Sequence, residues 1–161
     1  MITLSTARPD DVPAIADLAA EMDRHYGAAE LVPIEKRQEL VDLALFADPP
    51  TAWALLARDE QALIGFASYS FLWPAASMTG SLYLKELYVA QHTRRTHVGA
   101  ALMRGLAEVA VRLECSRLEW TTDRDNADAI AFYEALGFQP LESKVFYRLD
   151  GDTLKTAAGR R

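Results

Sequence analysis

Cysteine is nearly absent from this sequence, and long apolar runs are missing altogether. Cys115 is the single thiol, so no internal disulfide is possible. Its position near the end of a predicted helix favours a buried, inert thiol. No apolar run approaches the ~20 residues of a membrane span. The first residues, MITLSTARPDD, also lack the pattern of a secretory signal. We therefore expect a soluble, cytoplasmic protein with no membrane partner.

An excess of positive charge is missing too. The formal net charge is −6 and the sequence pI is about 5.1, whereas a general nucleic-acid binder needs a basic face. Metal chemistry finds little support, because His25, His92 and His97 are scattered and the cysteine stands alone. A Gly-Lys-Ser/Thr phosphate loop is also lacking. The composition therefore excludes several common classes and leaves a small-molecule enzyme or binding module.

The hydrophobic periodicity predicts one mixed α/β domain over residues 1–150, followed by a frayed tail at 151–161. Helical spacing and caps indicate helices between Pro9 and Gly27 and at 34–46, 98–113 and 127–136. Strand patterns occur at 2–7, 52–58, 62–72, 82–89, 117–121 and 145–149.

A basic turn connects the strand at 82–89 to the helix that follows it. The turn reads RRTHVGA from Arg94 to Ala100. A helix start supplies unpaired N–H groups and a partial positive charge, which suit a phosphorylated ligand. Paired arginines can face pyrophosphate oxygens, and Gly99 allows a close backbone approach. On spacing alone, a solvated basic turn with an ordinary glycine explains the same residues.

Two segments together resemble the GNAT superfamily of N-acetyltransferases. The first segment is LYV at 87–89, followed after four residues by RRTHVGAAL. It is similar to the acyl-CoA-binding motif of that family. Arg94 falls on the motif's Arg/Gln position, His97 on its first glycine and Gly99 on its Gly/Ala position. The run from Asn126 to FYEALGF, ending at Phe138, is similar to the family pattern of an asparagine followed by Tyr-x-x-Leu-Gly-Phe. The resemblance covers nearly the whole chain and is strongest over 82–138.

The resemblance implies a GNAT-type single domain. Its central sheet would be mixed and mostly antiparallel, with splayed fourth and fifth strands and about four helices. Acetyl-CoA would be the cosubstrate, with its pyrophosphate on the turn and its pantetheine arm along the strand. The implied cofactor-binding residues are Leu87, Tyr88, Val89, Arg94, Arg95, Thr96, His97, Val98, Gly99, Ala100, Asn126 and Tyr133. Asn126 is equally well suited to be a helix N-cap.

The turn departs from the family at Arg95 and His97, where glycine is usual. We expect His97 to keep a negative φ and still present its N–H, while its ring either adds a contact or crowds the phosphate. The alternative function is therefore a non-catalytic CoA-binding or sensor module with a degenerate pyrophosphate loop.

The resemblance also implies a mechanism in which a neutral primary amine attacks the thioester directly. A strand N–H, that of Val89 or its neighbour, would hold the oxyanion. Tyr133 would protonate the departing thiolate, because a phenol with a pKa near ~10 is protonated at neutral pH; without the resemblance it reads as a core aromatic. Glu86 would help to deprotonate the amine, or it simply pairs with Lys85 or an arginine. Strict alternation places Glu86 on one face with Leu82, Leu84 and Tyr88.

The acceptor is less well defined. IGFASYSF followed by LYLKELYV resembles the spermidine/spermine (polyamine and diamine) branch, but Lys85-Glu86 reverses half of that branch's acidic pair. The candidate acceptors are therefore a polyamine, a diamine or an amino acid. The first two helices and their loop usually grip the acceptor, and their residues suit either a cation or a solvated rim. These residues are Asp23, His25, Tyr26, Glu30 and Glu35, with Tyr69, Phe71 and Trp73 nearby. The resemblance implies a homodimer, and the aromatics Trp73 and Phe146 permit one without demanding it.

Overall fold

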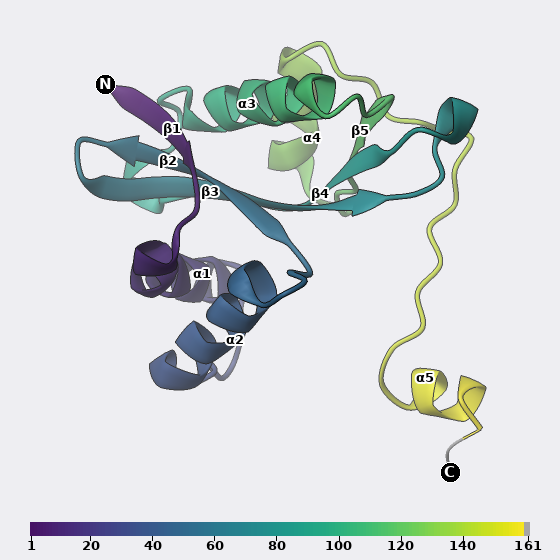
Figure 1. Ribbon diagram of the computed structural model, residues 1–161, viewed down its shortest axis with the longest axis horizontal. Helices are drawn as coiled ribbons and strands as arrows, with labels where there is room; N and C mark the ends of the chain where they lie inside the picture. Colours follow the sequence, from purple (N-terminus) through teal and green to yellow (C-terminus); the bar gives the residue numbers. More distant parts are fainter. Residues whose placement is uncertain (160–161) are drawn as a thin grey trace. The chain divides into compact units, whose positions relative to one another are not determined.

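The computed structural model describes residues 1–159, which form two compact units (Figure 1). The first unit runs from Met1 to Thr121 and contains the whole sheet. The second begins at Thr122 and contains two helices joined by an irregular segment.

The first unit is built on a five-stranded sheet whose strands follow the chain in the order β1-β2-β3-β4-β5. Neighbours are antiparallel except β4 and β5, which are parallel. The mixed, mostly antiparallel sheet expected from the sequence is therefore confirmed. The strands are β1 (Ile2–Thr6), β2 (Trp53–Asp59), β3 (Ala62–Leu72), β4 (Ser81–Val89) and β5 (Arg117–Glu119).

Three helices cover the two faces of this sheet (Figure 1). One face carries α1 (Val12–His25) and α2 (Ile34–Phe46), and the other carries α3 (Val98–Arg112). On the α1 side, Ile15 and Leu18 pack with Phe66 and Tyr88. On the α3 side, the helical spacing predicts an apolar stripe of Val98, Leu102, Leu106, Val109 and Leu113. The first four are buried, whereas Leu113, just past the end of the helix, is 52% exposed. Burying one apolar side chain of this size contributes ~1.5–3 kcal/mol to the stability of the fold. The apolar stripe at helical spacing therefore determines which face of each helix packs on the sheet.

β4 and β5 separate after a short contact. Their ladder joins Ser81–Arg117, Leu82–Leu118 and Tyr83–Glu119, whereas β4 continues alone to Val89. The ladder between β4 and β5 therefore ends at Tyr83, whereas the ladder between β4 and β3 continues to Val89. The predicted splay of the fourth and fifth strands is thus confirmed, and it leaves an open strand edge in the sheet.

A β-bulge at Lys85 changes which face of the sheet Glu86 occupies. Glu86 pairs with Ser68 and Leu84 pairs with Tyr69, so Lys85 is an extra residue without a partner. The bulge interrupts the two-residue alternation. Glu86 therefore shares the α1 face with Tyr88, but Leu82 and Leu84 lie on the α3 face. The strict alternation predicted for these four side chains is wrong at this point.

The second unit differs from the sequence prediction at its C-terminal end. It contains α4 (Ala127–Ala135) and α5 (Gly151–Ala157). The strand predicted at 145–149 does not form. A strand needs a neighbouring strand for its backbone hydrogen bonds, and the alternating pattern of one segment does not show whether such a neighbour exists. The tail predicted to fray is helical from Gly151: Thr153 Oγ1 accepts a hydrogen bond from Asp150 N (3.4 Å), and Lys155 pairs with Asp152 (3.0 Å). The described residues therefore contain five α-helices rather than about four.

Two smaller expectations concern Cys115 and membrane insertion. Cys115 is only partly buried, not the fully buried thiol expected. Among residues 1–159, no helix combines the length and the apolar character that crossing a bilayer requires.

Candidate functional site

The site begins where the turn after β4 enters α3. His97 is the N-cap of α3, and the first intrahelical bond runs from Ala101 N to His97 O (2.9 Å). The N–H groups of residues 98–100 therefore precede the helical ladder, as expected at a helix start. Arg95, Thr96 and His97 are exposed beside them. This arrangement is a helix N-terminus surrounded by accessible polar groups.

Arg95 and His97 both adopt the left-handed backbone conformation. Their φ angles are +66° and +67°. The prediction that His97 keeps a negative φ is therefore wrong. Each non-glycine residue in this region carries a strain of ~1–2 kcal/mol, which glycine would not carry. Glycine suits positions 95 and 97 because the backbone there needs a positive φ, not because a ligand needs the space of a missing side chain.

Replacing His97 with glycine is expected to stabilise the protein by ~1 kcal/mol, because it removes the left-handed strain. Urea unfolding would measure the change. Thr96→Gly is the matched control: Thr96 does not have a positive φ, so this change should destabilise. An equal loss of stability in both variants would contradict the role assigned to the backbone.

The Arg94 side chain folds back onto the end of β4. Its Nε donates to the Val89 carbonyl (3.3 Å), and its guanidinium carbon lies 5.4 Å from the centre of the Tyr88 ring. One terminal nitrogen lies 3.2 Å from His25 Nε2 on α1. The arginine thus joins the turn, the strand and the first helix through hydrogen bonds and a cation–π contact.

Sequence reasoning missed Glu21. Its Oε1 accepts hydrogen bonds from the Tyr88 hydroxyl (3.0 Å) and from Gln91 N (2.8 Å). One carboxylate on α1 therefore fixes both the end of β4 and the first residue of the following turn. The only sequence signal is an acidic residue beside the apolar stripe of α1, between Leu18 and Met22. That signal does not identify a partner 67 residues away.

This environment raises the pKa of Tyr88. Burial is the main cause, and the hydrogen bond and negative charge of Glu21 raise the pKa further, while Arg94 lowers it. Burial likewise raises the pKa of Tyr69, against a smaller opposing effect of Arg112. Both phenols are therefore held in the neutral form.

The two raised pKa values predict a loss of stability in alkali. Below the ordinary tyrosine pKa of about 10 their contribution is complete; it is lost as pH rises through the folded-state pKa, because the unfolded chain releases the protons first. Urea midpoints between about pH 9 and 11 would show the decline. Tyr88→Phe should make it shallower without abolishing it, since Tyr69 remains. An unchanged slope would contradict the assignment.

Glu86, the predicted proton acceptor, is half-buried on β4. It lies on the α1 face, two residues before Tyr88 and opposite Ser68. Leu87 and Val89 pair with Ala67 and Gly65 of β3. Their side chains lie on the α3 face of the sheet, opposite to Glu86.

Asn126 and Tyr133 belong to the second unit. Asn126 Oδ1 accepts a hydrogen bond from Ala129 N (3.1 Å), so its predicted role as the N-cap of α4 is confirmed. Tyr133 is half-buried on α4, with its ring 5.1 Å from that of Phe132. Of the predicted site residues, the first unit gathers those on β4, the turn and the start of α3.

The residues expected to grip the acceptor are engaged differently from the prediction. Asp23 forms an ion pair with Arg37 on α2 (2.7 Å), and His25 faces Arg94. Tyr69 and Phe71 pack with Trp53, which pairs with Tyr69 across the β2–β3 ladder. These three aromatic side chains lie on the α3 face of the sheet, opposite to α1. They are therefore excluded from an acceptor site on the α1 side.

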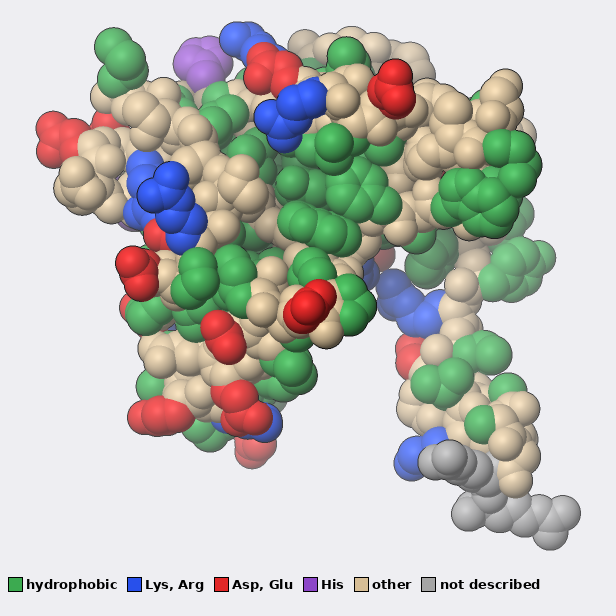
Figure 2. Space-filling view, viewed as in Figure 1, with side chains coloured by type: hydrophobic (Ala, Val, Ile, Leu, Met, Phe, Trp, Pro, Cys, Tyr) green, Lys and Arg blue, Asp and Glu red, His purple; other side chains and the backbone are tan. Residues whose placement is uncertain are grey.

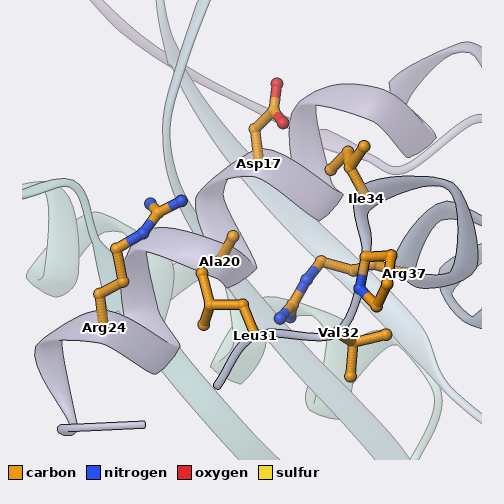
Figure 3. Close-up of a pocket in the computed structure, with 8 residues that line it drawn as sticks. Asp17, Ala20, Arg24, Leu31, Val32, Ile34 and Arg37 are labelled. Carbon is orange, nitrogen blue, oxygen red and sulfur yellow. The ribbon is translucent and has the colours of Figure 1, made fainter. Parts of the chain in front are cut away.

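A cleft opens instead between α1 and the segment that leads into α2 (Figure 3). Its volume is about 620 Å³. Asp17, Ala20 and Arg24 line it from α1, and Arg37 extends toward them from α2. The remaining lining residues are Leu31, Val32, Pro33 and Ile34.

Comparison with known proteins identifies related sequences and folds. Residues 13–138 match the model of the Acetyltransferase (GNAT) family. A bovine (Bos taurus) thialysine N-epsilon-acetyltransferase is 25% identical over 171 aligned positions, covering 99% of this chain and 98% of the relative. An L-ornithine N5-acetyltransferase from Arabidopsis thaliana is 29% identical, covering 60% of this chain but 42% of that protein. The chain thus spans less than half of that relative.

The solved structures include a close match to the fold. An integron cassette protein from the mobile metagenome of V. cholerae superimposes with a TM-score of 0.90 at 25% identity, covering 98% of this chain and 97% of the other.

Proposed function

Because this chain belongs to the Acetyltransferase (GNAT) family, we propose that it transfers an acetyl group from acetyl-CoA to the primary amine of a small molecule. One observation carries the proposal: the part of β4 that extends beyond its ladder with β5 leads, through the turn at 90–97, to the N-terminus of α3. An unpaired strand edge can bond an extended amide-containing arm, and a helix start can bond phosphate oxygens.

The residues of the first unit fit acetyl-CoA as a cosubstrate, which supplies the activated acetyl group as a thioester. The N–H groups of residues 98–100 and the exposed Arg95 would receive the pyrophosphate. The β4 backbone from Leu87 to Val89 would bond the pantetheine arm. Arg94 keeps the turn attached to β4 through Val89 O. The turn is therefore held in place before the cosubstrate binds.

The proposed chemistry needs a proton acceptor, an oxyanion donor and a proton donor. Glu86 would accept a proton from the incoming ammonium, directly or through water, because its half-buried carboxylate lies on the strand that ends at the turn. A β4 N–H, at Val89 or its neighbour, would stabilise negative charge on the acetyl oxygen. Tyr133 would donate its phenolic proton to the departing thiolate, and Asn126 would contact the CoA arm besides capping α4.

Small aliphatic amines are the acceptor class that the relatives support. The two relatives described above are named for thialysine and for L-ornithine, both amines. The resemblance of β3 and β4 to the polyamine branch adds diamines and polyamines to the class.

A thiol-release assay with acetyl-CoA and a panel of primary amines would test the proposal. The panel should contain polyamines, diamines, amino acids, aminoglycosides and protein N-termini. We expect turnover with at least one small amine. Silence across the panel, together with tight CoA binding in calorimetry, would favour the alternative of a non-catalytic CoA sensor. Failure to bind millimolar CoA would favour a degenerate scaffold.

We further propose that the protein works as a cytoplasmic homodimer. Each unit exposes an aromatic side chain, Trp73 in the first (69% exposed) and Phe146 in the second (62% exposed), and either leaves an apolar surface available to a second copy. Light scattering of the purified chain would measure its mass, and a monomer at micromolar concentration would oppose the dimer.

A further inference from the structure

His25, the last residue of α1, contacts the turn after β4 with both of its ring nitrogens. Its Nε2 lies 3.2 Å from a terminal nitrogen of Arg94, and its Nδ1 lies 3.5 Å from the side-chain amide of Gln91. The ring centre is 6.2 Å from that of Tyr88 on β4. Arg94 in turn bonds the Val89 carbonyl and lies over the Tyr88 ring. The arginine is thus held between the end of β4 and the end of α1.

These contacts determine where the neutral His25 ring carries its hydrogen. A guanidinium has donors only, so Nε2 must accept from Arg94 and cannot hold a hydrogen itself. The hydrogen of the neutral ring is therefore on Nδ1. This N–H donates to Gln91 when the amide oxygen of that residue faces the ring. One tautomer of His25 is thus compatible with both contacts.

Protonation would remove the acceptor that the His25 ring offers to Arg94. An imidazolium carries a hydrogen on both nitrogens and can only donate. Its Nε2–H would face an N–H of Arg94 across 3.2 Å, with a positive charge on each side. Histidine is the side chain whose charge changes between about pH 5 and 8, so a contact of this kind responds to pH in that range.

The charged groups around the His25 ring come from α1 and from the turn. On α1, Glu21 lies one helical turn earlier and Arg24 precedes the ring; the Glu21 carboxylate already accepts from two donors. The turn contributes Arg94. Acidic side chains gather on the surface over the neighbouring helix α2 (Figure 2); the exposed ones are Glu35, Glu39 and Asp42. Of all these groups, Arg94 is the one whose hydrogen bond to the ring depends on the ring's protonation.

We propose that His25 is a positioning residue for the cosubstrate turn: its neutral ring holds Arg94 in place, and protonation releases the arginine, so that CoA binds more weakly in mild acid. The inference rests on the proposed function, because Arg94 leads into the residues that would receive the pyrophosphate. A turn that is already ordered loses less conformational freedom when a ligand binds, and therefore binds it more tightly. Helix α1 would in this way make the affinity for the cosubstrate depend on pH.

Calorimetry with CoA tests the inference with two uncharged replacements of His25. His25→Gln places an amide oxygen near the position of Nε2 and is not protonated, whereas His25→Asn places its oxygen near Nδ1, out of reach of Arg94. At about pH 8 the original protein should bind CoA within about 2-fold of His25→Gln, and His25→Asn about 10-fold more weakly, the effect of one charge-assisted hydrogen bond. At about pH 5.5 the affinity of the original protein should fall to near that of His25→Asn.

Three controls assign the effect to the contact between His25 and Arg94. His92→Gln makes the same chemical change at an exposed position two residues before Arg94, so the pH profile should stay as in the original protein. In an Arg94→Ala background, His25→Asn should have no further effect on CoA affinity, because both residues act through one contact. Nitrogen NMR of the His25 ring at about pH 8 should find its hydrogen on Nδ1. Effects of His97 are common to the original protein and the two His25 variants, and cancel in the affinity ratios.

Two kinds of failure are distinguishable. A ratio of affinities between the original protein and His25→Gln that stays constant with pH would overturn the inference and leave the CoA site standing. A ring hydrogen on Nε2, or additive losses in the double variant, would overturn it in the same way. If the original protein does not bind CoA at about pH 8, the proposed function itself fails and the inference fails with it.

Discussion

Replacing Tyr133 with phenylalanine is expected to lower kcat about 100-fold, the lower limit for removing a general acid. KM for acetyl-CoA should change little, since the ring and its packing beside Phe132 are kept. The separation of the two parameters is the informative result. An interaction made only in the transition state lowers kcat, whereas a binding contact raises KM. Steady-state kinetics with a saturating amine would measure both.

The matched control is Tyr147→Phe, which makes the same chemical change at an exposed position in the same unit. It should leave kcat within about 2-fold of the original, as expected for a surface substitution away from the chemistry. A Tyr133→Phe variant that loses CoA affinity and turnover to the same extent would remove the general-acid role and return Tyr133 to an ordinary packing residue.

Elements that depend on local pattern were predictable from the sequence. The apolar stripe of α3 recurs at helical spacing from Val98 to Val109, and burial of that stripe is what holds the helix on the sheet. The Asn126 cap was predictable for the same reason: its acceptor is only three residues away, at Ala129. In both cases the physical cause lies within a few turns of chain.

Features that depend on distant partners were not predictable. The bulge at Lys85 is defined by the register of β4 against β3, which a single strand pattern does not contain. The positive φ of His97 follows from the path of the turn between β4 and α3, although glycine is the residue that adopts such a φ without strain. The strand predicted at 145–149 does not form, because within residues 1–159 no other strand pairs with that segment.

Glu21 is the clearest case of such a distant partner, and Glu21→Ala is expected to lower the free energy of unfolding by ~1–3 kcal/mol. The reason is that the Tyr88 hydroxyl, on a residue only 2% exposed, loses its acceptor inside the core. Gln91 N loses its acceptor as well, which releases the start of the turn. We therefore expect weaker CoA binding together with the loss of stability. Urea unfolding and calorimetry with CoA would measure the two effects.

Two further variants separate the hydrogen bonds from the loss of side-chain volume. Glu21→Gln keeps an amide oxygen that can accept from both donors, so it should recover more than half of the stability lost in Glu21→Ala. In a Tyr88→Phe background the hydroxyl is already gone, and the same alanine substitution should cost ~1 kcal/mol less. Additive losses in the double variant, or a glutamine variant as unstable as alanine, would show that Glu21 does not act through these two bonds. Because the same carboxylate contacts both β4 and Gln91, coupling between stability and CoA affinity is what distinguishes this arrangement from a helix that simply packs on the sheet.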